Sequence, residues 1–267
     1  MDTGGRAVLS GRRALVTGST GGLGYAIAQA LAQSGCSVML NGLEPEQAVA
    51  QKLQEIVPAP GAVALYCQAD LAQEAGVSGL VAAAQDRLGG VDILVNNAVV
   101  RHFAPVEAFD VAHWNTALAV NLSAAFHAIR LTVPQMRASG WGRIINMSSI
   151  YGSRGAPNRI DYVTTKTALL GLTRAVAAET LRDGITCNAV CPGAVHTPAS
   201  EQRIRAAMER DGQSRDEAER TFLVGKQPSG RFVEADDVAA LVVFLCGQAA
   251  RDITGATLPV DGGWLAS

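Results

Sequence analysis

Short apolar runs alternate with longer amphipathic stretches along almost the whole chain. The runs predict β-strands, and the stretches between them predict helices. We expect strands at residues 13–17, 37–41, 62–67, 91–95, 143–147, 186–190 and 257–260. We expect helices ending near residue 33 and at residues 45–56, 74–88, 111–137, 161–181 and 235–246. Because the strands are apolar on both faces and alternate with helices, the pattern indicates a doubly wound α/β sheet of about seven parallel strands in a single domain, residues 1–267.

The segment 198–226 departs from this pattern, because it is helical but dense in charge and carries little apolar periodicity. It follows the turn after the sixth predicted strand, at the carboxyl edge of the sheet. One interpretation is an exposed helix pair, and the other is a lid that moves over a substrate. We refer to residues 198–226 as the lid segment.

Composition excludes several classes of partner. The chain is 48% hydrophobic and 17% charged with a net charge of −2, which gives no electrostatic reason to expect nucleic acid or a membrane surface. No apolar run has the length of a signal peptide or a membrane span. Five cysteines lie in or beside apolar segments without metal-site spacing, so we expect free thiols, a cytoplasmic protein and no metal site.

A glycine-rich turn, TGSTGGLG at residues 17–24, lies between the first predicted strand and its helix. Gly18, Gly22 and Gly24 would let backbone N–H groups approach a pyrophosphate at the helix N-terminus. At the end of the second strand, Glu44 would repel the 2′-phosphate of NADP, and we expect no cation nearby to compensate. The turn therefore predicts a dinucleotide cofactor, and Glu44 favours NAD.

Tyr162 and Lys166 are four residues apart in a predicted helix, so their side chains share one face. An ammonium beside a phenol favours the phenolate, which suits proton exchange with an alcohol. Ser149 lies upstream and supplies a hydroxyl. The pair alone is a weak signal, because the same spacing also occurs on solvated helix faces.

Taken together, these motifs resemble the short-chain dehydrogenase/reductase family along essentially the whole chain, and imply its Rossmann-type fold. The resemblance rests on TGSTGGLG, Asp70, NNA at 96–98, Asn121, Ser149, Tyr162, Lys166 and the Pro192–Gly193 turn leading to Thr197. It implies Tyr162 as acid/base, Ser149 as holder of the substrate oxygen, Lys166 as ligand of the nicotinamide ribose, and Asn121 as holder of a relay water. It implies cofactor contacts from Gly18, Thr20, Gly22, Leu23, Gly24, Asn41, Leu43, Asp70, Leu71, Asn97, Tyr162, Lys166, Pro192, Gly193, Val195 and Thr197.

Within the family, the chain is most similar to bacterial NAD-dependent D-3-hydroxybutyrate dehydrogenases, for example in CNAVCPG at 187–193 and VDGGWLA at 260–266. That group binds its substrate carboxylate with glutamine, histidine and lysine. The matching positions here are Arg101, Tyr151, Arg159 and Arg203. Arginine grips an oxyanion through two parallel hydrogen bonds, so the change favours a more anionic substrate.

Two alternatives to a cationic substrate pocket remain open. The arginines could be surface residues paired with nearby acids, such as Arg159 with Asp161. Trp264, near the C-terminus, would either close the substrate pocket or pack between subunits.

We therefore predict an NAD-dependent oxidoreductase that interconverts a secondary alcohol and a ketone on a small anionic substrate. That substrate would be a hydroxy acid like 3-hydroxybutyrate, a dicarboxylate, a sulfonate or a phosphonate. The first alternative is reduction of a larger neutral ketone or a 3-oxoacyl thioester, and the second is a non-catalytic NAD-binding regulator. The resemblance also implies a homotetramer.

Overall fold

The computed structural model describes residues 8–267 and contains a seven-stranded sheet with every strand parallel to its neighbours. The strands are β1 (Arg13–Val16), β2 (Ser37–Gly42), β3 (Ala64–Gln68), β4 (Ile93–Asn96), β5 (Gly142–Met147), β6 (Ile185–Pro192) and β7 (Thr257–Val260), in the spatial order β3-β2-β1-β4-β5-β6-β7. This is the predicted doubly wound topology, in which the order reverses between β1 and β4.

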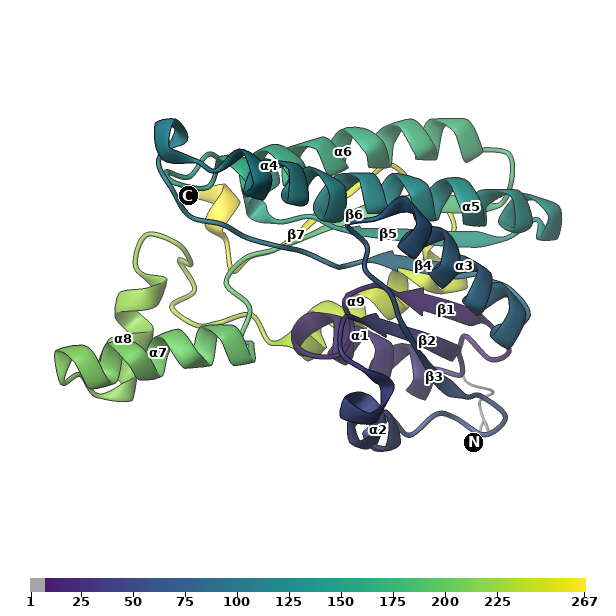
Figure 1. Cartoon of the computed structure of the whole chain (residues 1–267), viewed down its shortest axis with the longest axis horizontal. Helices are drawn as coiled ribbons and strands as arrows, with labels where there is room; N and C mark the ends of the chain where they lie inside the picture. Colours follow the sequence, from purple (N-terminus) through teal and green to yellow (C-terminus); the bar gives the residue numbers. More distant parts are fainter. Residues whose placement is uncertain (1–7) are drawn as a thin grey trace.

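Helices cover both faces of the sheet (Figure 1). The helices are α1 (Gly22–Gln33), α2 (Glu46–Glu55), α3 (Glu74–Leu88), α4 (Val111–Leu118), α5 (Ala124–Ser139), α6 (Ile160–Thr180), α7 (Pro198–Asp211), α8 (Arg215–Leu223) and α9 (Ala235–Cys246). Helices α1 and α9 pack on one face, whereas α3, α5 and α6 cover the other. The central strands are buried on both faces, which is why their sequences read as unbroken apolar runs.

The helix predicted at 111–137 is interrupted, so that prediction is wrong in one detail. A π-helical turn, Ala119–Ser123, separates α4 from α5 and contains the buried Asn121. Such turns interrupt α-helices frequently at functional sites. By length and composition, the stretch Val111–Ser139 could span a membrane, a criterion that core helices of soluble proteins also meet. Its α5 part packs on α3 and the sheet.

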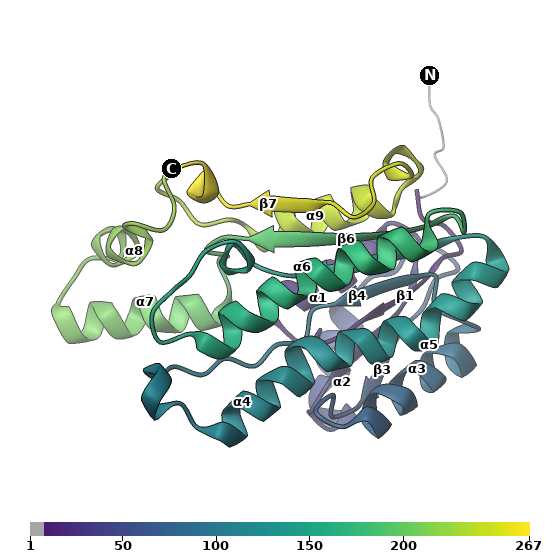
Figure 2. The ribbon, with the colours of Figure 1, turned by 90° about the horizontal axis from the view of Figure 1, so that it is seen from above.

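The lid segment forms two helices, α7 and α8, as the charge-dense pattern predicts. Figure 2 shows them beyond the end of the sheet toward which the β6 and β7 arrows point. Thr197 caps α7 and Ser214 caps α8, each with a reciprocal side-chain contact from the third helical residue. The segment is therefore anchored at the carboxyl edge, where the loops after the strands gather.

Candidate active site

A cavity of about 870 Å³ lies at the carboxyl edge of the sheet and brings together most of the predicted site residues. The predicted residues that line it are Gly18, Thr20, Leu23, Gly24, Asn41, Leu43, Asp70, Leu71, Asn97, Arg101, Ser149, Tyr151, Arg159, Tyr162, Lys166, Pro192, Gly193, Val195, Thr197, Arg203 and Trp264. Of the predicted residues, only Gly22 and Asn121 are not part of its lining. Cofactor and substrate candidates thus share one continuous space.

The glycine turn after β1 needs glycine for two separate reasons. Gly18 and Gly22 have φ angles of +58° and +54°, in the left-handed region that side chains disfavour. A Cβ on Gly24 would overlap the Asn97 side chain and the carbonyl of Gly18. The turn therefore brings bare backbone up to the cavity at the start of α1, a cradle that fits a pyrophosphate.

Two asparagines on the cofactor side hold neighbouring strand ends together. The Asn41 side chain accepts from the N–H of Gly18 at 3.2 Å and donates to the carbonyls of Cys67 and Ala69. The Asn97 side chain donates to the carbonyls of Thr17 and Gly18. Both residues line the cavity, but their side-chain groups brace the turn, so they shape the cofactor site mainly through the backbone they fix.

The end of the second strand departs from expectation at one point. Thr20 Oγ1 donates to the Glu44 carboxylate at 3.0 Å, and the Nζ of Lys52 donates to the carbonyl of Thr20 at 2.6 Å. Backbone hydrogen bonds are the main cause that lowers the pKa of Glu44, and the charge of Lys52 contributes. The prediction that no cation lies near Glu44 is wrong, because α2 brings Lys52 back toward the glycine turn.

Tyr162 and Lys166 lie on the same face of α6, as their spacing predicts. Both are buried, and the Nζ of Lys166 is 5.6 Å from the centre of the Tyr162 ring. The ammonium donates to the carbonyl of Met147 at the end of β5 at 2.6 Å. Ser149 follows Met147 by two residues, and its hydroxyl accepts from the N–H of Tyr151. The end of β5 therefore sets the positions of Lys166 and Ser149 together.

Burial dominates the electrostatics of Lys166. It is the main cause that lowers the pKa of this lysine from 10.5 to about 7, and the positive charge of Arg101 contributes in the same direction. No carboxylate within residues 8–267 forms an ion pair with this ammonium. Lys166 can therefore gain or lose a proton near neutral pH.

Asn121 lies behind Lys166, in the π-helical turn. Its side chain accepts from the N–H of Val100 at 2.8 Å and donates to the carbonyl of Val100 at 3.0 Å. A small cavity of about 10 Å³ is bordered by Asn121 and Lys166, among others. That volume is close to the minimum for one water molecule. The π-turn thus brings a fixed amide and a water-sized space to the inner side of Lys166.

The three arginines predicted to bind the substrate all line the main cavity. The Cζ of Arg101 lies 5.0 Å from the centre of the Tyr162 ring. The Cζ of Arg159 lies 4.5 Å from the centre of the Phe103 ring and 5.2 Å from that of Tyr151. The Cζ of Arg203, from α7, is 5.5 Å from the same Phe103 ring. Aromatic rings rather than carboxylates hold these guanidinium groups.

The pairing of Arg159 with Asp161 does not occur. Asp161 is fully buried and accepts hydrogen bonds from the N–H of Tyr162 and the N–H of His102, while the His102 ring lies 3.0 Å away. Arg159 precedes the first turn of α6 with a non-helical backbone, so its side chain takes a different direction. The surface-pair alternative is therefore wrong for Arg159.

Tyr151 connects the catalytic and cationic parts of the cavity. Its ring makes edge contacts with Tyr162 at 6.1 Å and with Trp264 at 5.6 Å between ring centres. Trp264 is buried within the chain and lines the cavity, a position that suits closing the pocket, and the alternative of packing between subunits stays open.

The sequence-based reasoning missed Lys226 and Phe222, which both line the cavity from the end of the lid segment. Neither belongs to a motif, and Lys226 follows α8 by three residues. The only signal was the position of the lid segment after a carboxyl-edge turn.

The arrangement combines a dinucleotide cradle, a tyrosine–lysine pair with a hydroxyl, and a cationic wall around one cavity. Such a set can exchange a proton with an alcohol oxygen while a hydride moves to or from a nicotinamide. Among residues 8–267, no group of three or more histidine, cysteine or acidic side chains is arranged to hold a metal ion.

Comparisons with known proteins agree with this interpretation. The family model described as enoyl-(acyl carrier protein) reductase matches residues 18–265. D-beta-hydroxybutyrate dehydrogenase from Cupriavidus necator is 40% identical over 259 residues, 97% of this chain and 100% of its own. The Rhizobium meliloti protein of the same name is 38% identical over 255 residues, 96% of this chain and 99% of its own.

A solved structure, L-sorbose reductase from Gluconobacter frateurii complexed with NADPH and L-sorbose, superposes with a TM-score of 0.91 at 28% identity. The superposition covers 98% of this chain and 100% of that one. Its fold matches the doubly wound sheet described above, and its NADPH is a dinucleotide, the class of cofactor that the glycine cradle fits. This chain belongs to the short-chain dehydrogenase/reductase family, as a nicotinamide-dependent oxidoreductase acting on secondary alcohols.

Proposed function

We propose that this enzyme uses NAD to interconvert a secondary alcohol and a ketone on a small anionic substrate. One observation carries the proposal: Arg101, Arg159 and Arg203 line the cavity that contains Tyr162, and none forms an ion pair with a carboxylate of residues 8–267. Unpaired guanidinium groups beside a catalytic tyrosine favour a substrate that brings its own negative charge.

In the oxidation direction, the Tyr162 phenolate removes the proton from the substrate hydroxyl. Ser149 donates a hydrogen bond to the same oxygen and stabilises its developing charge. The bound nicotinamide supplies the hydride acceptor. The Lys166 ammonium, 5.6 Å from the centre of the Tyr162 ring, stabilises negative charge on the substrate and tyrosine oxygens during the transfer, and the water-sized space beside Asn121 provides the exit for the proton.

The proposed preference for NAD rests on Glu44, whose carboxylate at the end of β2 would repel a 2′-phosphate. Lys52 acts in the opposite direction, but its Nζ is engaged by the Thr20 carbonyl. Because the similar L-sorbose reductase is complexed with NADPH, the test has to compare both cofactors.

The test is a panel of secondary alcohols with matched carbon chains, neutral or ending in a carboxylate, sulfonate or phosphate ester, assayed for reduction of NAD and of NADP. We expect kcat/KM to be at least about tenfold higher for anionic than for neutral alcohols, and higher with NAD. A panel in which neutral alcohols or thioesters react best would contradict the anionic substrate. Faster reduction of NADP than of NAD would contradict the role of Glu44.

A further inference from the structure

Lys226 adds a fourth cation to the wall of the cavity. It follows α8 through Gly225, whose φ of +68° reverses the chain. Its Nζ donates to the carbonyl of Phe222 at 2.8 Å and lies 4.2 Å from the centre of the Phe222 ring. One of the three ammonium protons is used in this way, so the others remain available to a ligand in the cavity.

Lys226, Arg159 and Arg203 line the same cavity, and we call them the cationic triad. Arg159 and Arg203 contact the same Phe103 ring at 4.5 Å and 5.5 Å. Burial lowers the pKa of Lys226, and the charges of Arg159 and Arg203 lower it further. Burial likewise lowers the pKa of Arg159, with further lowering by Arg101 and Arg203. Each member of the triad is therefore close enough to repel the others.

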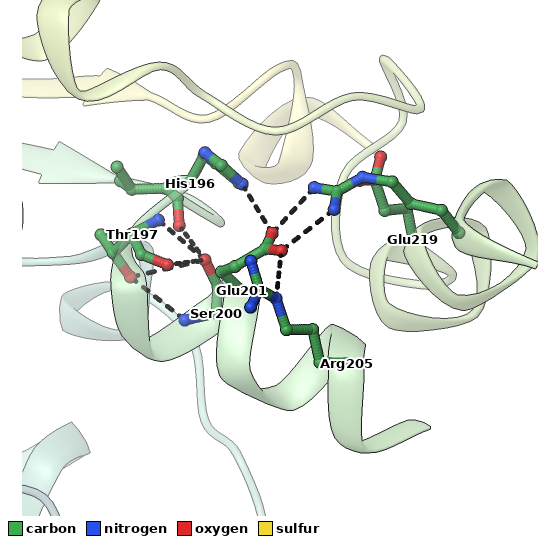
Figure 3. Close-up of polar contacts among 8 residues, drawn as sticks. His196, Thr197, Ser200, Glu201, Arg205 and Glu219 are labelled. Atoms are coloured by element: carbon green, nitrogen blue, oxygen red, sulfur yellow. Dashed lines mark hydrogen bonds and ion pairs between the residues drawn. The ribbon is translucent and has the colours of Figure 1, made fainter. Parts of the chain in front are cut away.

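Three other arginines of the lid segment, Arg205, Arg210 and Arg215, form ion pairs with acids, whereas Arg203 and Arg220 form none within residues 8–267. Glu201 accepts from Arg205 at 2.9 Å and from Arg215 at 2.8 Å, and its carboxylate lies 3.3 Å from the His196 ring (Figure 3). Arg215 also contacts Glu219, and Arg210 contacts Asp211. No acid within residues 8–267 forms an ion pair with a member of the triad. The paired acidic residues of the lid segment therefore contact arginines that do not line the cavity, and the positive charges of the triad are not neutralised by them.

Three mutually repelling cations on one cavity wall are more than a single carboxylate needs. A monoanion would neutralise one of them and leave two charges facing each other in a partly desolvated space. A compact dianion with three terminal oxygens offers each cation an oxygen and twice the charge. The charge count of the triad therefore favours a dianion.

Building on the proposed function, we propose that the acidic group of the substrate is a compact dianion of the phosphonate or phosphate monoester class, bound by the cationic triad. Tyr151 separates the triad from the catalytic tyrosine, with ring-centre distances of 6.1 Å to Tyr162 and 5.2 Å to the Arg159 guanidinium carbon. The reacting hydroxyl is then only a few bonds from the acidic group. Arg101, over the Tyr162 ring, would then lie beside the part of the substrate that connects the hydroxyl to the acidic group.

The test compares n-propyl phosphate with n-propyl sulfate, which have the same tetrahedral shape but differ by one negative charge. Calorimetric binding to the enzyme saturated with NADH at pH about 7.5 keeps the phosphate ester almost fully dianionic. We expect n-propyl phosphate to bind at least about tenfold more tightly. The preference should vanish at pH about 5, where the ester carries a single charge.

Lys226→Met and Arg203→Met should reduce the phosphate-over-sulfate ratio to about threefold or less. Arg210→Met is the matched control, because it removes an exposed lid charge that is paired with Asp211 and does not line the cavity. Its ratio should equal that of the wild-type enzyme.

Equal affinity for the two esters in the wild-type enzyme would overturn the dianion proposal, while oxidation of singly charged alcohols would leave the proposed function intact. If neither ester binds and only neutral alcohols are oxidised, both the dianion proposal and the proposed anionic substrate are wrong. Oxidation of 2-hydroxypropyl phosphate with a kcat/KM above that of 2-hydroxypropyl sulfate would support both.

Discussion

The two sides of the active cavity are built on opposite principles. On the catalytic side, Lys166 and Ser149 are buried and hydrogen-bonded to backbone, Lys166 to the carbonyl of Met147 at the end of β5 and Ser149 to the N–H of Tyr151 just beyond it. On the opposite side, Arg101 and Arg203 are exposed and held by aromatic rings without any carboxylate partner in the described chain. The first arrangement fixes geometry before any ligand arrives. In the second arrangement, the positive guanidinium groups have no carboxylate partner until an anionic ligand binds.

This difference explains how one catalytic set can serve many substrates. Backbone groups at a strand end change little when side chains change, so the catalytic side depends on the fold. The cationic side depends on side chains from four separated segments: the loop after β4, the approach to α6, α7, and the turn after α8. Each of these can change without disturbing the sheet. Chemistry and specificity are therefore encoded in different parts of the chain.

The largest expected effect comes from breaking the catalytic side alone. Tyr162→Phe removes the phenol oxygen but keeps the ring that Arg101 and Tyr151 contact. We expect kcat to fall by about a thousandfold or more, since general acid–base catalysis contributes that much. Steady-state kinetics on the best anionic alcohol measures the loss.

Cofactor affinity provides the control for this variant. NADH binding, followed by fluorescence, should stay within about twofold of wild type, because the hydroxyl is not part of the dinucleotide cradle. A variant that keeps full turnover with normal NADH affinity would show that Tyr162 is not the acid/base.

Breaking the cationic side should have a smaller and selective effect. Arg159→Met should lower kcat/KM for the anionic alcohol by about a hundredfold, because a charged hydrogen bond contributes roughly 1.5–3 kcal/mol. The matched neutral alcohol should react as before. Equal losses for both alcohols would mean that Arg159 supports the catalytic geometry, and the two sides of the cavity would not be independent.

The remaining expected effect is on stability rather than turnover and concerns the buried ammonium. Below pH about 7, Lys166 is charged in the folded and unfolded enzyme, and the full cost of burial is present. Between pH 7 and 10.5 the folded state loses the proton first, so this cost shrinks as pH rises. The contribution of Lys166 to the free energy of unfolding should therefore rise by up to about 1.4 kcal/mol per pH unit in that window.

Urea unfolding of the cofactor-free enzyme from pH 7 to 9 measures this slope. In Lys166→Met, the rise due to the lysine should be missing, so the difference between the two proteins should change with pH. Parallel stability curves would show that Lys166 titrates alike in both states.

The catalytic side could be predicted from the sequence because its determinants are local. Tyr162 and Lys166 are one helical turn apart, and the glycine turn is contained in eight residues. Their relation to each other follows from helix and turn geometry alone. The parallel direction of the strands follows in the same way from apolar runs separated by helices, whereas their spatial order comes from the structure.

The cationic side could be predicted only in part. The family comparison indicated three arginines, but Lys226 reaches the cavity through a turn after α8, which no local pattern marks. Lys52 likewise meets Thr20 only because α2 folds back on the glycine turn. Asp161 is the reverse case: it is two residues from Arg159, yet its carboxylate faces His102. Closeness in sequence predicts contact only inside a regular element.

Thr197 lines the cofactor cavity and caps the first helix of the lid segment, and this has a kinetic consequence. Its hydroxyl accepts from the N–H of Ser200 and so caps α7, the helix that carries Arg203. A dinucleotide that settles against Thr197 therefore steadies the first turn of α7 and, with it, one arm of the substrate site. We expect a compulsory order of events, in which the dinucleotide enters first, the substrate second, and the reduced dinucleotide leaves last.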